Sequence, residues 1–344
     1  MTFIRSLSIC VFLIQCAFVQ LAMAGDNVYF PPGAGSWAEV SVAEAGLNAE
    51  KLEQALRYAE EQKSSGMVIL YQGRLVAERN WQISEYGSFS SMVAGKTDDG
   101  RFIEDVASVQ KSVVSMLCGI AQGKGLLNLA ASVQDYLGKG WSKAPDKAEQ
   151  AITVRHLLTM TSGLTTALEF EQPAGTKFKY NTQAYSRLHR VLEVASGMKF
   201  DVLTKDWLTD PIGMNESRWV ARKRAGGAGV NARGFATTAR DLARMGVFVL
   251  ANGQWDGKDV LGNSDYLQKA LNPSQQLNRN YGFLWWLNTE KNAVPAAPAD
   301  MVMAKGAGIR RVYVVPSLDL VVTRIGNIPE KDFDKKFWAL LLGD

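Results

Sequence analysis

Ser108 and Lys111 have the residue types and spacing in this chain best suited to covalent chemistry. They stand three residues apart in Ser108-Val-Gln-Lys111, where an apolar stretch begins. Residues three apart on a helix share one face, so the hydroxyl and the amine can come within hydrogen-bonding distance. The apolar stretch predicts a helix buried on every side, and burial favours the neutral amine, which can accept a proton. The pair therefore predicts a nucleophile and its base.

The same four-residue pattern occurs a second time, at Ser196-Gly-Met-Lys199. Ser196 follows an amphipathic run and precedes Gly197, a usual end of a helix, so Lys199 would lie beyond that helix. We expect Ser196 to be structural. For Ser108, the motif alone also allows a serine at a helix N-terminus with a solvated lysine one turn later.

Residues 1–24 are predicted to form a secretory signal peptide. Arg5 precedes an apolar run from Ser6 to Ala22, and Ala22-Met-Ala24 has the small-x-small pattern of a cleavage site. We expect the protein to be secreted, or periplasmic if the source is a Gram-negative bacterium. Because the run is short and contains Gln15 and Gln20, no stable membrane span is expected after cleavage.

The remaining residues, 25–344, are expected to form a single catalytic domain. Loss of 24 residues from 344, with Arg5 as their one charged residue, leaves 320 residues and lowers the net charge from +4 to +3. So mild a charge does not indicate nucleic acid or an anionic membrane as a partner. Cys118 would be the one cysteine left, so no internal disulfide is expected and the core must supply the stability.

Strand patterns near both chain ends predict an α/β fold, with one mainly antiparallel sheet built from both ends and flanked by helices. A largely helical inserted domain is expected between them. The sheet lobe would cover about 25–107 and 231–344, and the helical lobe about 108–230. The predicted helices start near Asn48, Ser108, Thr237 or Thr238 and Asp332, and the predicted strands are Met67–Tyr71, Leu75–Glu78, Tyr281–Trp286, Arg311–Val315 and Leu320–Arg324. The serine helix would lie between the lobes, where ligand clefts are common.

Several motifs in order along the chain resemble the serine β-lactamase and penicillin-binding protein superfamily. The resemblance is to the branch that holds class C β-lactamases, family VIII carboxylesterases and 6-aminohexanoate-dimer hydrolases, and it covers nearly the whole mature chain. The motifs are Ser108–Lys111, Gly125–Asn128, Ile152–Leu164, Phe178–Tyr185, Thr237–Ala243 and Ala304–Gly308. The resemblance implies a β-lactamase-like fold with Ser108 as nucleophile and Lys111 as base.

The resemblance also implies a catalytic role for Tyr180, which matches the tyrosine of the family motif Tyr-x-Asn. As a phenolate, or through a proton shared with Lys111, it would act as general base and then as general acid for the leaving group. Taken alone, Tyr180 could be a partly buried aromatic residue at the start of a helix. Thr182 occupies the asparagine position and Asn181 stands one place early. Both are candidates for the substrate cleft, and the departure weakens an antibiotic-directed function.

The family's Lys-Thr-Gly motif is also altered. Ala304, Lys305 and Gly306 align with its three positions, so the lysine is shifted by one and, on a strand, would point to the opposite face. Lys305 and Gly306 are nevertheless candidates for the cleft. The resemblance implies an oxyanion hole from the backbone amides of Ser108 and Ala307, with glycine allowing close approach of the substrate.

Other chemistries find little support. His156 and His189 are the only histidines and no Gly-x-Ser-x-Gly elbow accompanies them, and no zinc-site pattern is present. We therefore expect a serine hydrolase without metal or organic cofactor, acting on a small-molecule ester or linear amide. The alternatives are a β-lactamase or D-alanyl-D-alanine peptidase and, from another class, a non-catalytic binding protein on the same fold. The sequence leaves the oligomeric state open.

Overall fold

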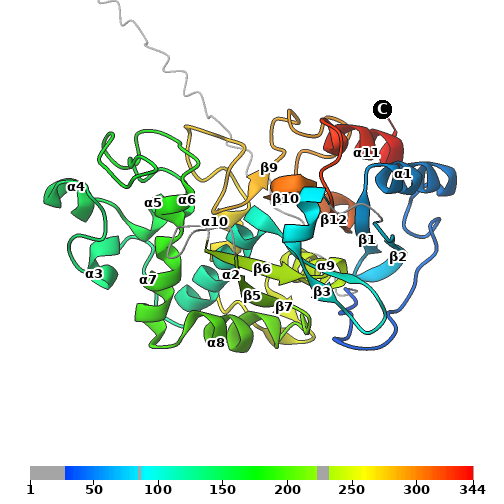
Figure 1. Cartoon of the computed structure of the whole chain (residues 1–344), viewed down its shortest axis with the longest axis horizontal. Helices are drawn as coiled ribbons and strands as arrows, with labels where there is room; N and C mark the ends of the chain where they lie inside the picture. The colour runs from blue at the N-terminus through cyan, green and yellow to red at the C-terminus, as the bar shows by residue number, and fades with distance from the viewer. Residues whose placement is uncertain (1–27, 84–86, 223–231, 344) are drawn as a thin grey trace, which may run out of the picture.

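A computed structural model describes residues 28–83, 87–222 and 232–343. The predicted signal peptide lies outside these residues. The fold combines a six-stranded sheet, a four-stranded sheet, a short two-stranded ribbon and helices around them (Figure 1). Within the described part of the chain, no helix is both long and apolar enough to cross a membrane.

The helices and strands have the following bounds. The helices are α1 (Ala49–Glu61), α2 (Gln110–Gly123), α3 (Val133–Leu137), α4 (Asp146–Gln150), α5 (Val154–Leu158), α6 (Thr182–Tyr185), α7 (Arg187–Ser196), α8 (Phe200–Thr204), α9 (Ala239–Leu250), α10 (Ser264–Ala270) and α11 (Phe333–Leu342). The strands are β1 (Ser64–Tyr71), β2 (Arg74–Asn80), β3 (Val93–Lys96), β4 (Phe102–Asp105), β5 (Arg218–Ala221), β6 (Arg233–Thr237), β7 (Gln254–Trp255), β8 (Lys258–Asp259), β9 (Trp286–Leu287), β10 (Val302–Gly306), β11 (Arg310–Val315) and β12 (Leu320–Gly326). Short helical turns lie at η1 (Gly87–Met92), η2 (Ala107–Val109), η3 (Lys205–Thr209), η4 (Ala307–Ile309) and η5 (Pro316–Leu318).

The six-stranded sheet joins the two ends of the chain, as the sequence predicted. Its strand order is β2-β1-β12-β11-β10-β9, and every neighbouring pair is antiparallel. The predicted helix starts are also confirmed, because the Asn48 side chain caps α1 and the Thr238 side chain caps α9. The β-lactamase-like fold class expected from the motifs is therefore the fold of this chain.

Both faces of this sheet are covered, which explains its nearly continuous apolar strands. Along β1, Val68 and Leu70 belong to the core shared with α2 and α9, whereas Met67 and Ile69 belong to the core under α1 and α11. This division follows from the alternation of side chains along a strand. Figure 1 shows α1 and α11 together beside the sheet, near the C-terminus.

Two parts of the chain differ from the prediction. The run Tyr281–Trp286 is not a strand, since β9 holds only Trp286–Leu287. Leu284 adopts a left-handed φ of 61°, and its N–H donates to the Leu158 carbonyl, so the apolar run is an irregular core segment. The region 108–230 also contains β5, which pairs with β6 in a sheet of order β3-β4-β6-β5. Strands this short carry too little periodicity to be recognised.

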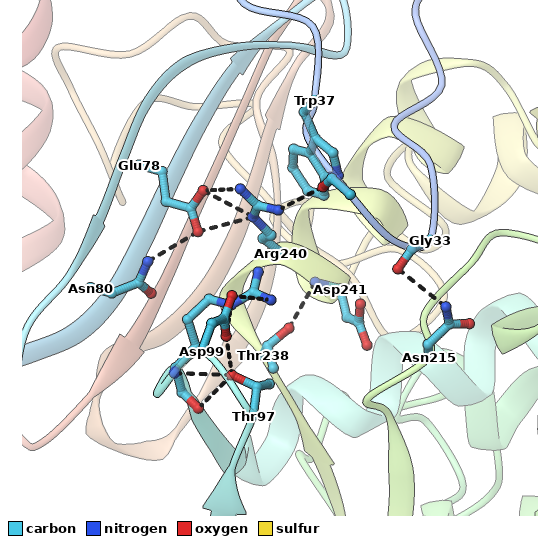
Figure 2. A network of polar contacts seen from close by, with 12 residues as sticks. Gly33, Trp37, Glu78, Asn80, Thr97, Asp99, Asn215, Thr238, Arg240 and Asp241 are labelled. Atoms are coloured by element: carbon cyan, nitrogen blue, oxygen red, sulfur yellow. Dashed lines mark hydrogen bonds and ion pairs between the residues drawn. The ribbon is translucent and has the colours of Figure 1, made fainter.

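Arg240 of α9 links this helix to the chain before α1 and to β2 (Figure 2), and it donates to the Gly35 carbonyl at 3.3 Å. Arg240 forms an ion pair with Glu78 at 2.7 Å and lies over the Trp37 ring at 4.7 Å, and Asn215 donates to the Gly33 carbonyl at 3.1 Å. A cavity of about 270 Å³ lies beside these residues and is lined by paired acidic and basic side chains. It does not include Ser108.

Candidate active site

Ser108 lies in a strained turn between β4 and α2. The preceding residue, Ala107, has φ 51°, which is unusual for a residue other than glycine and tends to occur at functional sites. The Asp105 carboxylate stabilises this conformation by accepting the Ala107 N–H at 3.0 Å. Asp105 is held in turn by Arg222 through two hydrogen bonds of 2.5 and 2.8 Å. This ion pair therefore fixes the turn that presents the serine.

A glycine on the neighbouring strand makes room for this ion pair. A Cβ atom at Gly234 of β6 would stand 2.1 Å from Oδ2 of Asp105. Any other residue at that position would displace the carboxylate, since heavy atoms do not approach so closely. The four-stranded sheet thus shapes the backbone just before the serine.

Lys111 stands one turn into α2 and reaches back to Ser108. Its Nζ lies 3.1 Å from the Ser108 Oγ, in hydrogen-bonding distance. Residues Gln110 to Ala121 of α2 are all buried, which confirms the predicted helix buried on every side, and Lys111 is only 2% exposed. Burial, assisted by the positive charge of Arg222, lowers the pKa of Lys111 to about 7. Near neutral pH, much of the lysine is therefore a neutral amine beside the serine hydroxyl.

Two tyrosine rings surround the lysine. The Nζ of Lys111 lies 5.0 Å from the ring centre of Tyr180 and 4.8 Å from that of Tyr185. These contacts favour the charged ammonium, but the pKa is lowered, so the desolvation effect is the larger one. The Tyr185 hydroxyl lies 3.2 Å from Nε2 of His189, which is half-buried and stacked on Phe200.

Tyr180 comes to the nucleophile from the loop before α6. Burial raises the pKa of Tyr180, which makes the neutral phenol its resting form near neutral pH. The Ser108 side chain lowers this pKa in part, which indicates that the phenol lies beside the serine that Lys111 contacts. The ring stacks on Trp286 with 5.8 Å between ring centres. This geometry favours proton sharing over a resting phenolate.

Asn181 and Thr182 stand at the start of α6, and the Asn181 side chain is fully engaged with backbone groups. Its Oδ1 accepts from the N–H groups of Gln183 and Ala184, and its Nδ2 donates to the carbonyls of Leu164 and Thr165. With 1% exposure, Asn181 caps a helix and anchors a loop, and it offers no hydrogen-bonding group to a substrate. Thr182, the first residue of α6, is half-buried.

Lys305 and Gly306 occupy the last two positions of β10. Met303 packs in the core under α1 and α11 and Ala304 in the core beside α2, so alternation places Lys305 on the α11 side. Its Nζ lies 5.4 Å from the Trp286 ring centre. Burial lowers the pKa of Lys305, and the nearby Asp334 carboxylate opposes this effect only in part. The lysine thus lies on the opposite face from the Ala304 side chain.

Gly306 brings the end of β10 against the serine turn. A Cβ at this position would stand 2.2 Å from the Val106 carbonyl oxygen and 3.1 Å from the Val109 side chain. Only glycine allows this approach. Ala307, whose amide the resemblance implicated in the oxyanion hole, follows directly.

The other residues considered from the sequence have structural contacts. Ser196 donates to the Leu192 carbonyl at 2.7 Å, and Nδ1 of His156 accepts the Thr153 N–H in a helix cap. Cys118 is buried, and burial raises the pKa of its thiol, which makes it a poor nucleophile. Arg222 was not identified from the sequence, because no sequence pattern links it to Asp105, which lies 117 residues earlier in the chain.

The fold and the serine–lysine–tyrosine cluster define a β-lactamase-like protein. The chain belongs to the Beta-lactamase family, whose model matches residues 50–343. This membership supports a hydrolase, and at a coarse level a serine hydrolase. No curated protein matches the chain.

Solved structures with the same fold have low sequence identity to this chain. One is named "Crystal structure of putative beta-lactamase from Bacteroides dorei DSM 17855", with a TM-score of 0.66, 18% identity, and coverage of 85% of this chain and 95% of that chain. A second, "Putative 6-aminohexanoate-dimer hydrolase from Bacillus anthracis", has a TM-score of 0.66, 16% identity and coverage of 91% and 88%. A third is a beta-lactamase from Mycobacterium bovis, with a TM-score of 0.61, 18% identity and coverage of 83% and 96%.

Proposed function

We propose that this protein is an exported serine hydrolase that cleaves an ester or a linear amide through an acyl-enzyme on Ser108. The observation that carries the proposal is the 3.1 Å contact between Lys111 Nζ and Ser108 Oγ, made by a buried lysine whose pKa is lowered to about 7. A neutral amine at this distance can take the serine proton as the hydroxyl attacks a carbonyl.

In the proposed reaction, the Ser108 oxygen bonds to the carbonyl carbon while its proton passes to Lys111. The bond between the carbonyl carbon and the leaving group then breaks as the proton reaches that group through Tyr180, which lies beside Ser108. The backbone amides of Ser108 and Ala307 hold the negative charge of the tetrahedral intermediate. Water releases the acid by the same steps in reverse order.

Two departures from the β-lactamase motifs support an ester or linear amide as substrate. Asn181 is engaged by four backbone groups, and Thr182 stands where β-lactamases place the amide-binding asparagine. Lys305 lies on the α11 side of β10, away from the position expected of a carboxylate-binding lysine. The name of one solved structure with this fold, a putative 6-aminohexanoate-dimer hydrolase, supports including a linear amide in the proposal.

A substrate panel tests the proposal. The purified mature protein and its Ser108→Ala variant would be assayed with p-nitrophenyl acetate and butyrate, 6-aminohexanoate dimer and a chromogenic cephalosporin. We expect turnover of the esters or the linear amide by the wild type and none by the variant. Turnover of the cephalosporin alone would favour the β-lactamase alternative, and the absence of both turnover and covalent labelling would favour a binding protein.

Export is part of the proposal and rests on the signal-peptide pattern at residues 1–24. The test is N-terminal sequencing of the protein recovered from the periplasm or medium of an expressing Gram-negative host. We expect the mature chain to begin at Gly25. An intact N-terminus in the cytoplasm would contradict it.

A further inference from the structure

The turn between β10 and β11 has an unusual set of hydrogen bonds, because buried arginine side chains hold each of its four carbonyl groups. The turn comprises residues 306–309 and begins at the last residue of β10, Gly306, which packs against Val106 and Val109 on either side of Ser108. The bonds run from Arg311 to the Gly306 carbonyl at 2.9 Å, from Arg310 to the Ala307 carbonyl at 2.9 Å, and from Arg324 to the carbonyls of Gly308 and Ile309 at 2.9 and 3.0 Å.

Burying the guanidinium groups of these arginines costs desolvation free energy, and an ordinary hairpin turn forms without such buried charges. They are between 0% and 6% exposed, and burial lowers the pKa of Arg324 to about 10. Carboxylates compensate two of them: Arg310 pairs with Glu104, and Arg311 pairs with Asp334 of α11. A connection this short is normally stabilised by turn residues alone, so the arginines indicate that the orientation of its peptide groups matters.

Arg311 is the arginine that holds the carbonyl of Gly306, and a carboxylate and a tyrosine fix it in place. Its Nε and Nη2 donate to Oδ2 of Asp334 at 3.1 and 3.0 Å, and Oδ1 of Asp334 accepts the Tyr313 hydroxyl at 2.7 Å. Although burial raises the pKa of Asp334, Arg311 and Tyr313 bring it below its usual value, so the carboxylate is charged. The guanidinium is thus fixed on one side while Nη1 reaches the Gly306 carbonyl.

The direction of one amide follows from this contact. The Gly306 carbonyl and the Ala307 N–H belong to the same peptide group, and the described chain has no cis peptide bond. In a trans peptide the carbonyl and the N–H point to opposite sides. With the carbonyl held by Arg311, the Ala307 N–H must point away from Arg311. Gly306 itself lies against Val106 and Val109, which flank Ser108.

We propose that Arg311, fixed by Asp334, is a positioning residue that orients the peptide group between Gly306 and Ala307 so that the Ala307 amide donates to the oxyanion. This inference rests on the proposed acyl-enzyme function. Arg311 does not touch the substrate. It acts on the transition state through the amide, since a preoriented donor stabilises charge without reorganising during the reaction.

The test compares Arg311→Met with Arg240→Met. Arg240, like Arg311, forms an ion pair with a carboxylate, that of Glu78, but it is only partly buried and lies in the first turn of α9, away from the turn at residues 306–309. For p-nitrophenyl butyrate we expect Arg311→Met to lower kcat at least about tenfold with KM nearly unchanged, because removal of one oxyanion donor costs 10²–10³ and misorientation costs a part of that. Affinity for phenylboronic acid, which forms a tetrahedral adduct with serine, should fall by a similar factor. Arg240→Met should keep its kcat.

An unchanged kcat in Arg311→Met, a change in KM alone, or an equal loss in Arg240→Met would overturn the inference. If Arg311→Met does not fold, Arg311→Lys is measured instead, because one ammonium cannot hold both Asp334 and the Gly306 carbonyl in the same fork geometry. Failure of the proposed function can be distinguished from failure of this inference. If the proposed function is wrong, the wild-type protein will neither hydrolyse the ester nor react with a fluorophosphonate. In that case a crystal structure of the variant decides, and an unmoved Gly306–Ala307 peptide would refute the positioning role.

Discussion

Lys111 Nζ lies 3.1 Å from Ser108 Oγ even though the lysine is almost completely buried. Burial lowers the pKa of Lys111, and the positive charge of Arg222 lowers it further. The two tyrosine rings beside the ammonium do not offset these effects, so the neutral amine is favoured. The chemistry of the site therefore depends on pH through this one residue.

The pH dependence of ester hydrolysis should show an acidic limb near pH 7. Below its pKa of about 7, Lys111 is protonated and cannot accept the serine proton, so kcat/KM should fall about tenfold per pH unit. The measurement is kcat/KM for p-nitrophenyl butyrate between pH 5 and 9, corrected for spontaneous hydrolysis. A profile that is flat down to pH 5 would show that Lys111 is not the base.

Lys111→Met should abolish activity and stabilise the fold. The pKa of Lys111 is lower in the folded protein than in the unfolded chain, so the buried lysine costs stability. That cost is complete below about pH 7 and diminishes as pH rises toward 10.5. Methionine of similar length should therefore raise the free energy of unfolding by about 1–2 kcal/mol at pH 6, and by less at pH 9. Urea denaturation at the two pH values measures this.

Lys199→Met is the matched control for that variant. Lys199 belongs to the second Ser-x-x-Lys pattern but is exposed, at the N-cap of α8. It should change neither stability nor activity appreciably, whereas Lys111→Met should lower kcat/KM at least about a hundredfold. A folded Lys111→Met protein with less than a tenfold loss would assign Lys111 a structural role.

The charge of Arg222 should be visible in the same pH profile. Its positive charge lowers the pKa of Lys111, so Arg222→Gln should move the acidic limb to higher pH. Arg222→Lys keeps the charge but loses the fork on Asp105, and should lower kcat with less movement of the limb. If both variants shift the acidic limb of the pH profile equally, Arg222 acts on the pKa of Lys111 through the geometry of the site and not through its charge.

Tyr180 and Tyr185 offer a paired test of proton transfer. Both rings lie about equally near Lys111, but Tyr180 lies beside Ser108, whereas the Tyr185 hydroxyl is hydrogen-bonded to His189. Tyr180→Phe should lower kcat about a hundredfold or more for an ester with a poor leaving group, such as ethyl butyrate, and less for a p-nitrophenyl ester. Tyr185→Phe should leave kcat nearly intact. Equal effects of the two substitutions would contradict a specific role for Tyr180.

The sequence predicted the sheet from both chain ends because its strands are apolar runs bounded by clear turns. It also predicted α1 and α9 correctly, since Asn48 and Thr238 are strong caps at the start of amphipathic runs. The strand expected at Tyr281–Trp286 failed for a different reason. Those side chains are apolar because an irregular segment is packed in the core, and periodicity cannot distinguish that from a strand.

Within the site, local sequence could predict only the pair that is close along the chain. Ser108 and Lys111 share one helical turn, so their contact follows from spacing. Asp105 and Arg222 meet because β4 and β5 flank β6, and Arg311 reaches Gly306 across a hairpin and Asp334 on the last helix. Such long-range pairings depend on the completed fold and leave no periodic pattern in the sequence.

The most direct test of the central claim is the mass of the protein after reaction with a fluorophosphonate. The wild type and Ser196→Ala should each gain one probe, with the modified peptide mapping to Ser108, because the Ser108 hydroxyl contacts a buried lysine whose lowered pKa favours the neutral amine. Folded Ser108→Ala should gain none. Stoichiometric labelling of Ser108→Ala, or a modified peptide that excludes position 108 in the wild type, would contradict the account.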